Sequence, residues 1–288
     1  MTDVAARPPR AASTVRSVLL LGPDYPTRRE TVIAGISACV DGIDGPRGDP
    51  AALGAALSAG WMPKAVPSVE PNEDGVLLAA GPGGLLLAVA DGHGGSAAST
   101  AALRGLAAAA ADLLATPAEG AAGRGGGARL VRALTAAAVD GVADVAEPAR
   151  TALGLVLAVD ESIFSIGYGD TLTALVRRGR PRVISTPSEF LGPGTRGSED
   201  EDRSVQRRHR RPGDAVLIVS DGVPDYLGRA FPEVVGAVLR GDGRSAPDAP
   251  AVGRALVGRA GAAGAGDNIT AAVLLPAAAP SWRARWRR

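Results

Sequence analysis

The segment that decides the fold is VLLAAGPGGLLLAVADGHGG, residues 76–95. It contains two apolar runs, at 76–80 and 85–90, separated by the turn-forming residues Gly-Pro-Gly-Gly at 81–84. Short apolar runs on either side of such a turn predict a β-hairpin. The second run leads into Asp-Gly-His at 91–93, so the hairpin carries a carboxylate and an imidazole at the end of a strand.

The order of the other expected elements indicates the fold class. Alanine-rich residues 96–114 and residues 129–146 predict two helices after the hairpin. Further strands are expected at 151–159, 163–168, 172–177, 182–185, 215–220 and 269–275, with helices at 232–240 and 250–260. Strands in runs and helices in pairs favour an α+β fold, an antiparallel β-sandwich flanked by helices, over a doubly wound sheet.

Composition and charge exclude several classes of protein. The 288 residues contain 31 basic and 30 acidic residues, a net charge of +1, which disfavours a nucleic-acid partner. A single cysteine, Cys39, excludes an internal disulfide and a two-cysteine zinc site. No apolar run is long enough for an integral membrane segment. These features predict a soluble protein of the reducing cytoplasm.

Five aspartates stand at the ends of expected strands, most of them beside glycine. They are Asp74, Asp91, Asp170, Asp221 and Asp267. One Asp-Gly pair is an ordinary turn signal, but five such sites together favour a shared role. Grouped carboxylates repel unless a cation neutralises them, and Mg²⁺ and Mn²⁺ prefer oxygen ligands. Two metals bridged by one aspartate would activate water for phosphoryl transfer.

His93 lies two residues from Asp91. A lone histidine in a turn is usually solvated, as we expect for His209 in RRHRR. Because imidazole titrates near neutrality, His93 in this acidic motif suits proton delivery to a leaving serine or threonine oxygen.

These motifs resemble the metal-dependent protein serine/threonine phosphatases of the protein phosphatase 2C type, the PPM family. The resemblance covers residues 61–275 and includes the family's motifs in order: NED at 72–74, VADGHGG at 89–95, GD at 169–170, SDGVPD at 220–225 and DNIT at 267–270. It implies a four-layer αββα catalytic domain. It also implies hydrolysis of phosphoserine and phosphothreonine with two Mn²⁺ or Mg²⁺ ions.

The resemblance assigns a metal-ligand role to five residues. Asp91 resembles the aspartate that bridges both metals, and the carbonyl of Gly92 resembles a further ligand. Asp221 and Asp267 resemble ligands of the first metal, while Asp74 resembles a residue that holds the second.

The remaining assignments concern proton transfer and a third ion. Glu73 resembles the acid that holds metal-bound water, and His93 resembles the general acid. Asp170 and Asp225 match positions that hold a third, looser metal in some members. The implied partners are a phosphorylated protein substrate and a serine/threonine kinase or its targets; the oligomeric state is not determined.

The sequence departs from the family pattern at two points. The stretch 66–72 lacks the usual phosphate-binding arginine, with Lys64 as the nearest base, and the GD motif continues as Thr171-Leu172 instead of Ser-Arg. Two hypotheses therefore stay open. One is an active phosphatase; the other is a non-catalytic binding or regulatory module that keeps metals but has lost productive phosphate binding.

The ends of the chain lie outside the expected catalytic domain. Residues 1–16 are expected to be disordered, and 276–288 form a basic tail that suits either a solvated end or contact with anionic lipid. Residues 17–60 have no assigned role, although 15–21 suit a strand and 51–58 a short helix.

Overall fold

The computed structural model describes residues 15–38, 51–64, 70–116, 125–195, 205–241 and 248–275. Within these ranges the strands form two antiparallel sheets of six strands each. The first sheet contains, in spatial order, β1 (Arg16–Leu21), β4 (Gly75–Gly81), β5 (Gly84–His93), β6 (Arg150–Val159), β7 (Ser162–Tyr168) and β10 (Gln206–His209). The second contains β2 (Val32–Ala38), β3 (Ala51–Ser58), β12 (Ile269–Leu274), β11 (Ala215–Val219), β8 (Leu172–Arg177) and β9 (Arg180–Val183).

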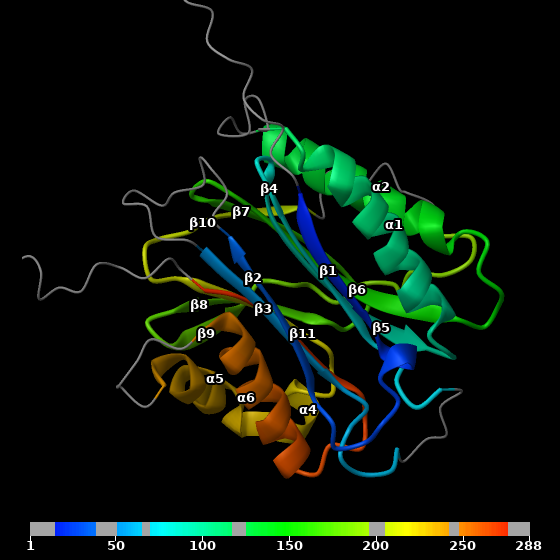
Figure 1. Cartoon of the computed structure of the whole chain (residues 1–288), viewed down its shortest axis with the longest axis vertical. Coiled ribbons are helices and arrows are strands. Elements are labelled where there is room, and N and C mark those ends of the chain that lie inside the picture. The colour runs from blue at the N-terminus through cyan, green and yellow to red at the C-terminus, as the bar shows by residue number, and fades with distance from the viewer. Residues whose placement is uncertain are drawn as a thin grey trace, which may run out of the picture.

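Helices cover the outer face of each sheet. They are α1 (Ala97–Leu113), α2 (Gly126–Val142), α4 (Pro224–Leu227), α5 (Phe231–Arg240) and α6 (Ala249–Ala262), with short 3-10 turns at Gly22–Asp24 and Gly228–Ala230. Figure 1 shows α1 and α2 over the first sheet and α5 and α6 over the second. The expected α+β sandwich with four layers is confirmed.

The hairpin strands bury both of their faces. Leu77 and Leu86 face α1 and α2, whereas Leu78 and Leu87 face the second sheet. Alternate residues of a strand point to opposite faces, so a strand between a helix layer and another sheet needs apolar residues at every position. This explains the uninterrupted apolar runs on both sides of the turn.

The helix expected at 51–58 is wrong, because these residues form β3 between β2 and β12. Alanine favours a helix in isolation, but here small residues allow α6 to approach the strand closely. A Cβ at Gly54 would overlap the backbone of Ala249 and Pro250 in α6. Pairing on both sides and this close contact override the local preference.

The segment 17–60, to which the sequence assigned no role, supplies strands to both sheets: β1 to the first and β2 and β3 to the second. The polar stretch around His209 forms a strand, β10, and not the turn in which we expected this residue. The side chain of His209 is 64% exposed, in agreement with the expected solvation. Residues 1–14 and the basic tail at 276–288 lie outside the described residues.

None of the helices in the described ranges combines the length and apolar character that a membrane span requires.

We expect Gly54→Ala to lower the free energy of unfolding by about 1–3 kcal/mol, because the added methyl group must displace the α6 backbone. Gly258→Ala is the matched control, since a Cβ at that position of α6 meets nothing within 4 Å. Its better helix propensity should raise stability by about 0.5–1 kcal/mol. Urea denaturation measures both values, and equal midpoints for the two variants would contradict this packing argument.

Candidate metal centre

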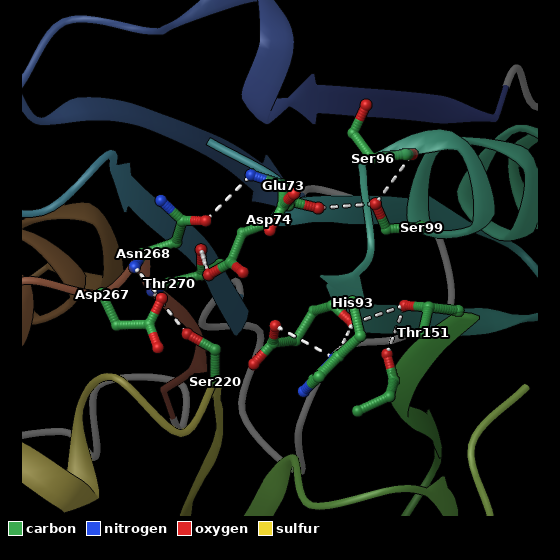
Figure 2. Close-up of polar contacts among 12 residues, drawn as sticks. Glu73, Asp74, His93, Ser96, Ser99, Thr151, Ser220, Asp267, Asn268 and Thr270 are labelled. Carbon is green, nitrogen blue, oxygen red and sulfur yellow. Dashed lines mark hydrogen bonds and ion pairs between the residues drawn. The ribbon is translucent and has the colours of Figure 1, made fainter. Parts of the chain in front are cut away.

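Four of the predicted metal ligands lie at one edge of the sandwich. Asp74 directly precedes β4, Asp91 lies near the end of β5, Asp221 follows β11 and Asp267 precedes β12. Antiparallel pairing places the start of β4 beside the end of β5, and the start of β12 beside the end of β11. A 2.7 Å hydrogen bond from Thr270 Oγ1 to Asp74 Oδ2 joins the two sheets there (Figure 2). Side chains far apart in the sequence therefore meet.

Asn268 connects the two loops that carry the acids. Its Oδ1 accepts a 2.9 Å hydrogen bond from the backbone N–H of Glu73 (Figure 2). Its Nδ2 donates to the carbonyl of Pro71 at 2.8 Å. Its own N–H donates to Asp267 Oδ1 at 2.8 Å. Behind it, Gly222 is required, because a Cβ there would overlap the Asn268 carbonyl. One carboxamide thus fixes the relative positions of both loops.

Hydroxyl groups from α1 and β6 hold the backbone at Glu73 and Asp91 in place. Ser99 of α1 donates to the carbonyl of Glu73 at 2.6 Å, and Thr151 of β6 donates to the carbonyl of Asp91 at 2.8 Å (Figure 2). Gly92 stands between them, and a Cβ there would lie 2.6 Å from the Glu73 carbonyl oxygen. The glycine therefore permits β5 to run close beside the NED loop.

Three carboxylate oxygens of this edge are buried without a hydrogen-bond partner in the described structure: Glu73 Oε1, Asp74 Oδ1 and Asp91 Oδ2. Leaving a buried acceptor unsatisfied costs about 1–3 kcal/mol, and more for a charged group. Oxygen donors of this kind are what Mg²⁺ and Mn²⁺ bind. The donor set therefore fits divalent cations.

The carboxylates also perturb one another's protonation. Burial raises the pKa of Asp74 to about 7, against hydrogen bonds from Thr270 and Ser220 that lower it. Burial, followed by the charges of Asp74 and other acids, raises the pKa of Asp91 well above its ordinary value. Burial and neighbouring acids raise the pKa of Asp221 to about 6. The site thus favours bound protons or cations over free negative charge.

The two acids expected to hold a third ion lie further out. Asp170 is exposed in the turn after β7, and Asp225 is exposed in α4. Their charges nevertheless raise the pKa of Asp221, so both lie within electrostatic range. In the described ranges, no three His, Cys, Asp or Glu side chains are arranged as ligands around one point.

Lys64 introduces a positive charge among these acids. Its Nζ lies 3.0 Å from Asp267 Oδ1, 3.0 Å from Asn268 Oδ1 and 3.4 Å from Glu73 Oε2. Burial lowers the pKa of Lys64, but the carboxylates of Asp267 and Glu73 outweigh this effect and raise it overall. Lys64 therefore remains an ammonium ion.

His93 lies beside Asp91 at the end of β5. Its Nδ1 is 3.4 Å from the Asp91 carbonyl oxygen and 3.8 Å from Asp91 Oδ1. The edge of its ring meets Phe190, with ring centroids 4.6 Å apart, and Arg150 lies 6.0 Å from the Phe190 centroid. Because Nδ1 faces Asp91, the Nε2 atom lies on the other side of the ring.

The sequence profile of the protein phosphatase 2C family matches residues 65–243, more than half of the chain. The chain belongs to the protein phosphatase 2C family. No curated protein matches it.

Solved structures of bacterial phosphatases share the fold of this protein phosphatase 2C family member. The catalytic domain of the serine/threonine phosphatase PstP, in complex with two manganese ions, superposes with a TM-score of 0.59 at 20% identity, covering 85% of this chain and 99% of that chain. The Mycobacterium tuberculosis serine/threonine phosphatase PstP/Ppp gives a TM-score of 0.59 at 22% identity, covering 78% of this chain and 97% of that chain. The S. agalactiae serine/threonine phosphatase gives a TM-score of 0.58 at 15% identity, covering 86% of this chain and 100% of that chain.

Several supporting residues of this protein phosphatase 2C site received no role from the sequence. Asn268 and Thr270 belong to the DNIT motif and Ser220 to the SDG motif. The motifs mark these residues, but the sequence does not show that they hydrogen-bond to the loops and acids of the site. Phe190 gave no signal, because its contact with His93 joins two segments that are distant in the sequence.

We expect the EDTA-treated protein to lose stability as the pH rises from about 5 to about 7. Asp74 and Asp221 have folded-state pKa values of about 7 and about 6, above the unfolded value of about 3.9. The folded state therefore binds more protons in this window, and raising the pH favours unfolding. Melting temperatures measured across this range test the sign.

Asp91→Asn is the control for this pH dependence. It removes one of the buried acids that bind a proton more tightly in the folded state, so its melting temperature without metal should fall less between pH 5 and pH 7 than that of the wild type. A wild-type melting temperature that rises across the window faster than that of the variant would contradict the argument.

Proposed function

We propose that this chain is a metal-dependent protein serine/threonine phosphatase. The observation that carries the proposal is that the sandwich edge with His93 holds three buried carboxylate oxygens without a hydrogen-bond partner in the described structure. Membership of the protein phosphatase 2C family supports the same reaction. The proposal implies a phosphorylated protein as substrate and a serine/threonine kinase acting on the same protein.

Five residues would hold the two metal ions. We assign Asp91 as the bridging ligand, with the Gly92 carbonyl, Asp74, Asp221 and Asp267 as the others. When bound, two Mn²⁺ or Mg²⁺ ions supply the Lewis acidity that activates water and stabilises charge on the phosphoryl group. The complex of PstP with two manganese ions is consistent with this ion pair.

Three further acids would act around that pair. Glu73 would orient the attacking water through its Oε1 atom, which is buried and has no hydrogen-bond partner in the described structure. Asp170 and Asp225 would hold a third ion weakly, since both side chains are exposed.

His93 would supply the proton that the leaving group needs. Its Nδ1 faces the carbonyl and carboxylate of Asp91, which would hold the ring with Nε2 directed away from that residue. As water bonds to phosphorus, the bond from phosphorus to the serine or threonine oxygen breaks, and that oxygen takes the proton from Nε2. The products are the free hydroxyl side chain and inorganic phosphate.

The alternative is a non-catalytic module that binds phosphoproteins. Its motivation is the absence of arginine from residues 66–72, of which 66–69 lie outside the described residues. Wild-type protein that binds a phosphopeptide at saturating Mn²⁺ without any turnover would establish this alternative and exclude the phosphatase.

We expect Mn²⁺-dependent release of phosphate from a phosphoserine peptide, reduced to background in Asp91→Asn. His93→Asn should slow this substrate by about 10²–10⁴-fold, the usual contribution of a general acid. An aryl phosphate whose leaving group departs as a stable anion needs no proton, so its hydrolysis should fall much less. Equal losses on both substrates would contradict the role of His93.

A further inference from the structure

The single lysine of the sequence, Lys64, lies within the acidic site. Lysine is seldom buried unless it is paired, yet this side chain is only 13% exposed. Its backbone is held near Asp267, because the N–H groups of Trp61 and Met62 both donate to the carbonyl of Ala265, at 2.8 and 3.0 Å. Lys64 is therefore built into the site by its own chain segment.

The ammonium group has a partner for each of its protons. An ammonium donates three hydrogen bonds, and the acceptors present are Asp267 Oδ1, Asn268 Oδ1 and Glu73 Oε2. A substrate phosphate would have to displace one of them. The ammonium group is therefore a counter-ion of the acids around it. It differs from a cation whose hydrogen-bond donors are free to bind an added anion.

The contact also bears on metal binding. Asp267 Oδ1 accepts from both Lys64 and the Asn268 N–H, so one oxygen of a proposed ligand is already occupied. A divalent cation on the same carboxylate would be repelled by an ammonium at this distance. The Lys64 ammonium and a divalent metal ion therefore cannot both bind the Asp267 carboxylate at their preferred distances.

We infer that Lys64 is an internal counter-ion of the acidic site that competes with a divalent metal for Asp267. The inference rests on the metal binding that the proposed function requires. The ammonium group offsets the repulsion between the carboxylates when no metal is bound. A metal ion must displace it from Asp267, which makes the binding free energy of the metal less favourable. Lys64 therefore stabilises the metal-free protein and weakens metal affinity.

The test uses Lys64→Met, which keeps an unbranched side chain and removes the charge. Isothermal titration of EDTA-treated, dialysed protein with Mn²⁺ should show a Kd lower by about tenfold, a typical coupling between competing ligands. The melting temperature of the variant without metal should be lower at pH 7.5, and its rise on adding saturating Mn²⁺ should be larger than in the wild type.

Arg254→Met is the matched control, because it removes one positive charge from an exposed position of α6. Its Mn²⁺ affinity should equal that of the wild type, which would separate a local contact from a change in net charge. An equal gain in both variants would overturn the inference.

The outcomes for Lys64→Met separate this inference from the proposed function. Wild-type binding of Mn²⁺ with equal or weaker binding by Lys64→Met would overturn the counter-ion role and leave the phosphatase standing. Unchanged Mn²⁺ affinity with loss of inhibition by inorganic phosphate would instead make Lys64 a phosphate ligand. If neither protein binds Mn²⁺, the metal centre itself fails and the inference fails with it.

Discussion

Repulsion between buried carboxylates is the constraint on which the rest of this structure depends. Asp74, Asp91 and Asp221 each have a raised pKa because burial and neighbouring negative charge disfavour the ionised form. Flexible loops would relieve this repulsion by moving apart. Here the acids stay together because paired strands carry them and because Thr270 and Asn268 tie the loops across the two sheets.

The four-layer fold supplies the stiffness that this arrangement needs. The acids come from both sheets, so the apolar layer between the sheets sets their separation, and the helices keep each outer face dry. Close backbone contacts add precision where a side chain would intrude, as at Gly92 beside the Glu73 carbonyl and at Gly222 beside Asn268. Stability and site geometry therefore depend on the same packing.

The chain shares the protein phosphatase 2C fold but neutralises its acidic site in a way of its own. The stretch 66–72 before and at the NED motif contains no arginine, and Lys64 reaches the site from the segment that follows β3. Its ammonium touches an acid from each of the two loops, Glu73 and Asp267. Lys64 therefore adds a charged contact between the loops that Asn268 already connects.

The hairpin and the sandwich class could be predicted from the sequence, as could the acids proposed for the site, because uninterrupted apolar runs and Asp-Gly pairs are local signals. It misassigned β3, since alanine and glycine in AALGAALS reveal their strand only when β2, β12 and α6 surround them. The tertiary structure alone decided the contacts of Lys64, Asn268 and Phe190. Each contact joins segments distant in the sequence, so no local pattern encodes it and only the packed sheets bring the partners within reach.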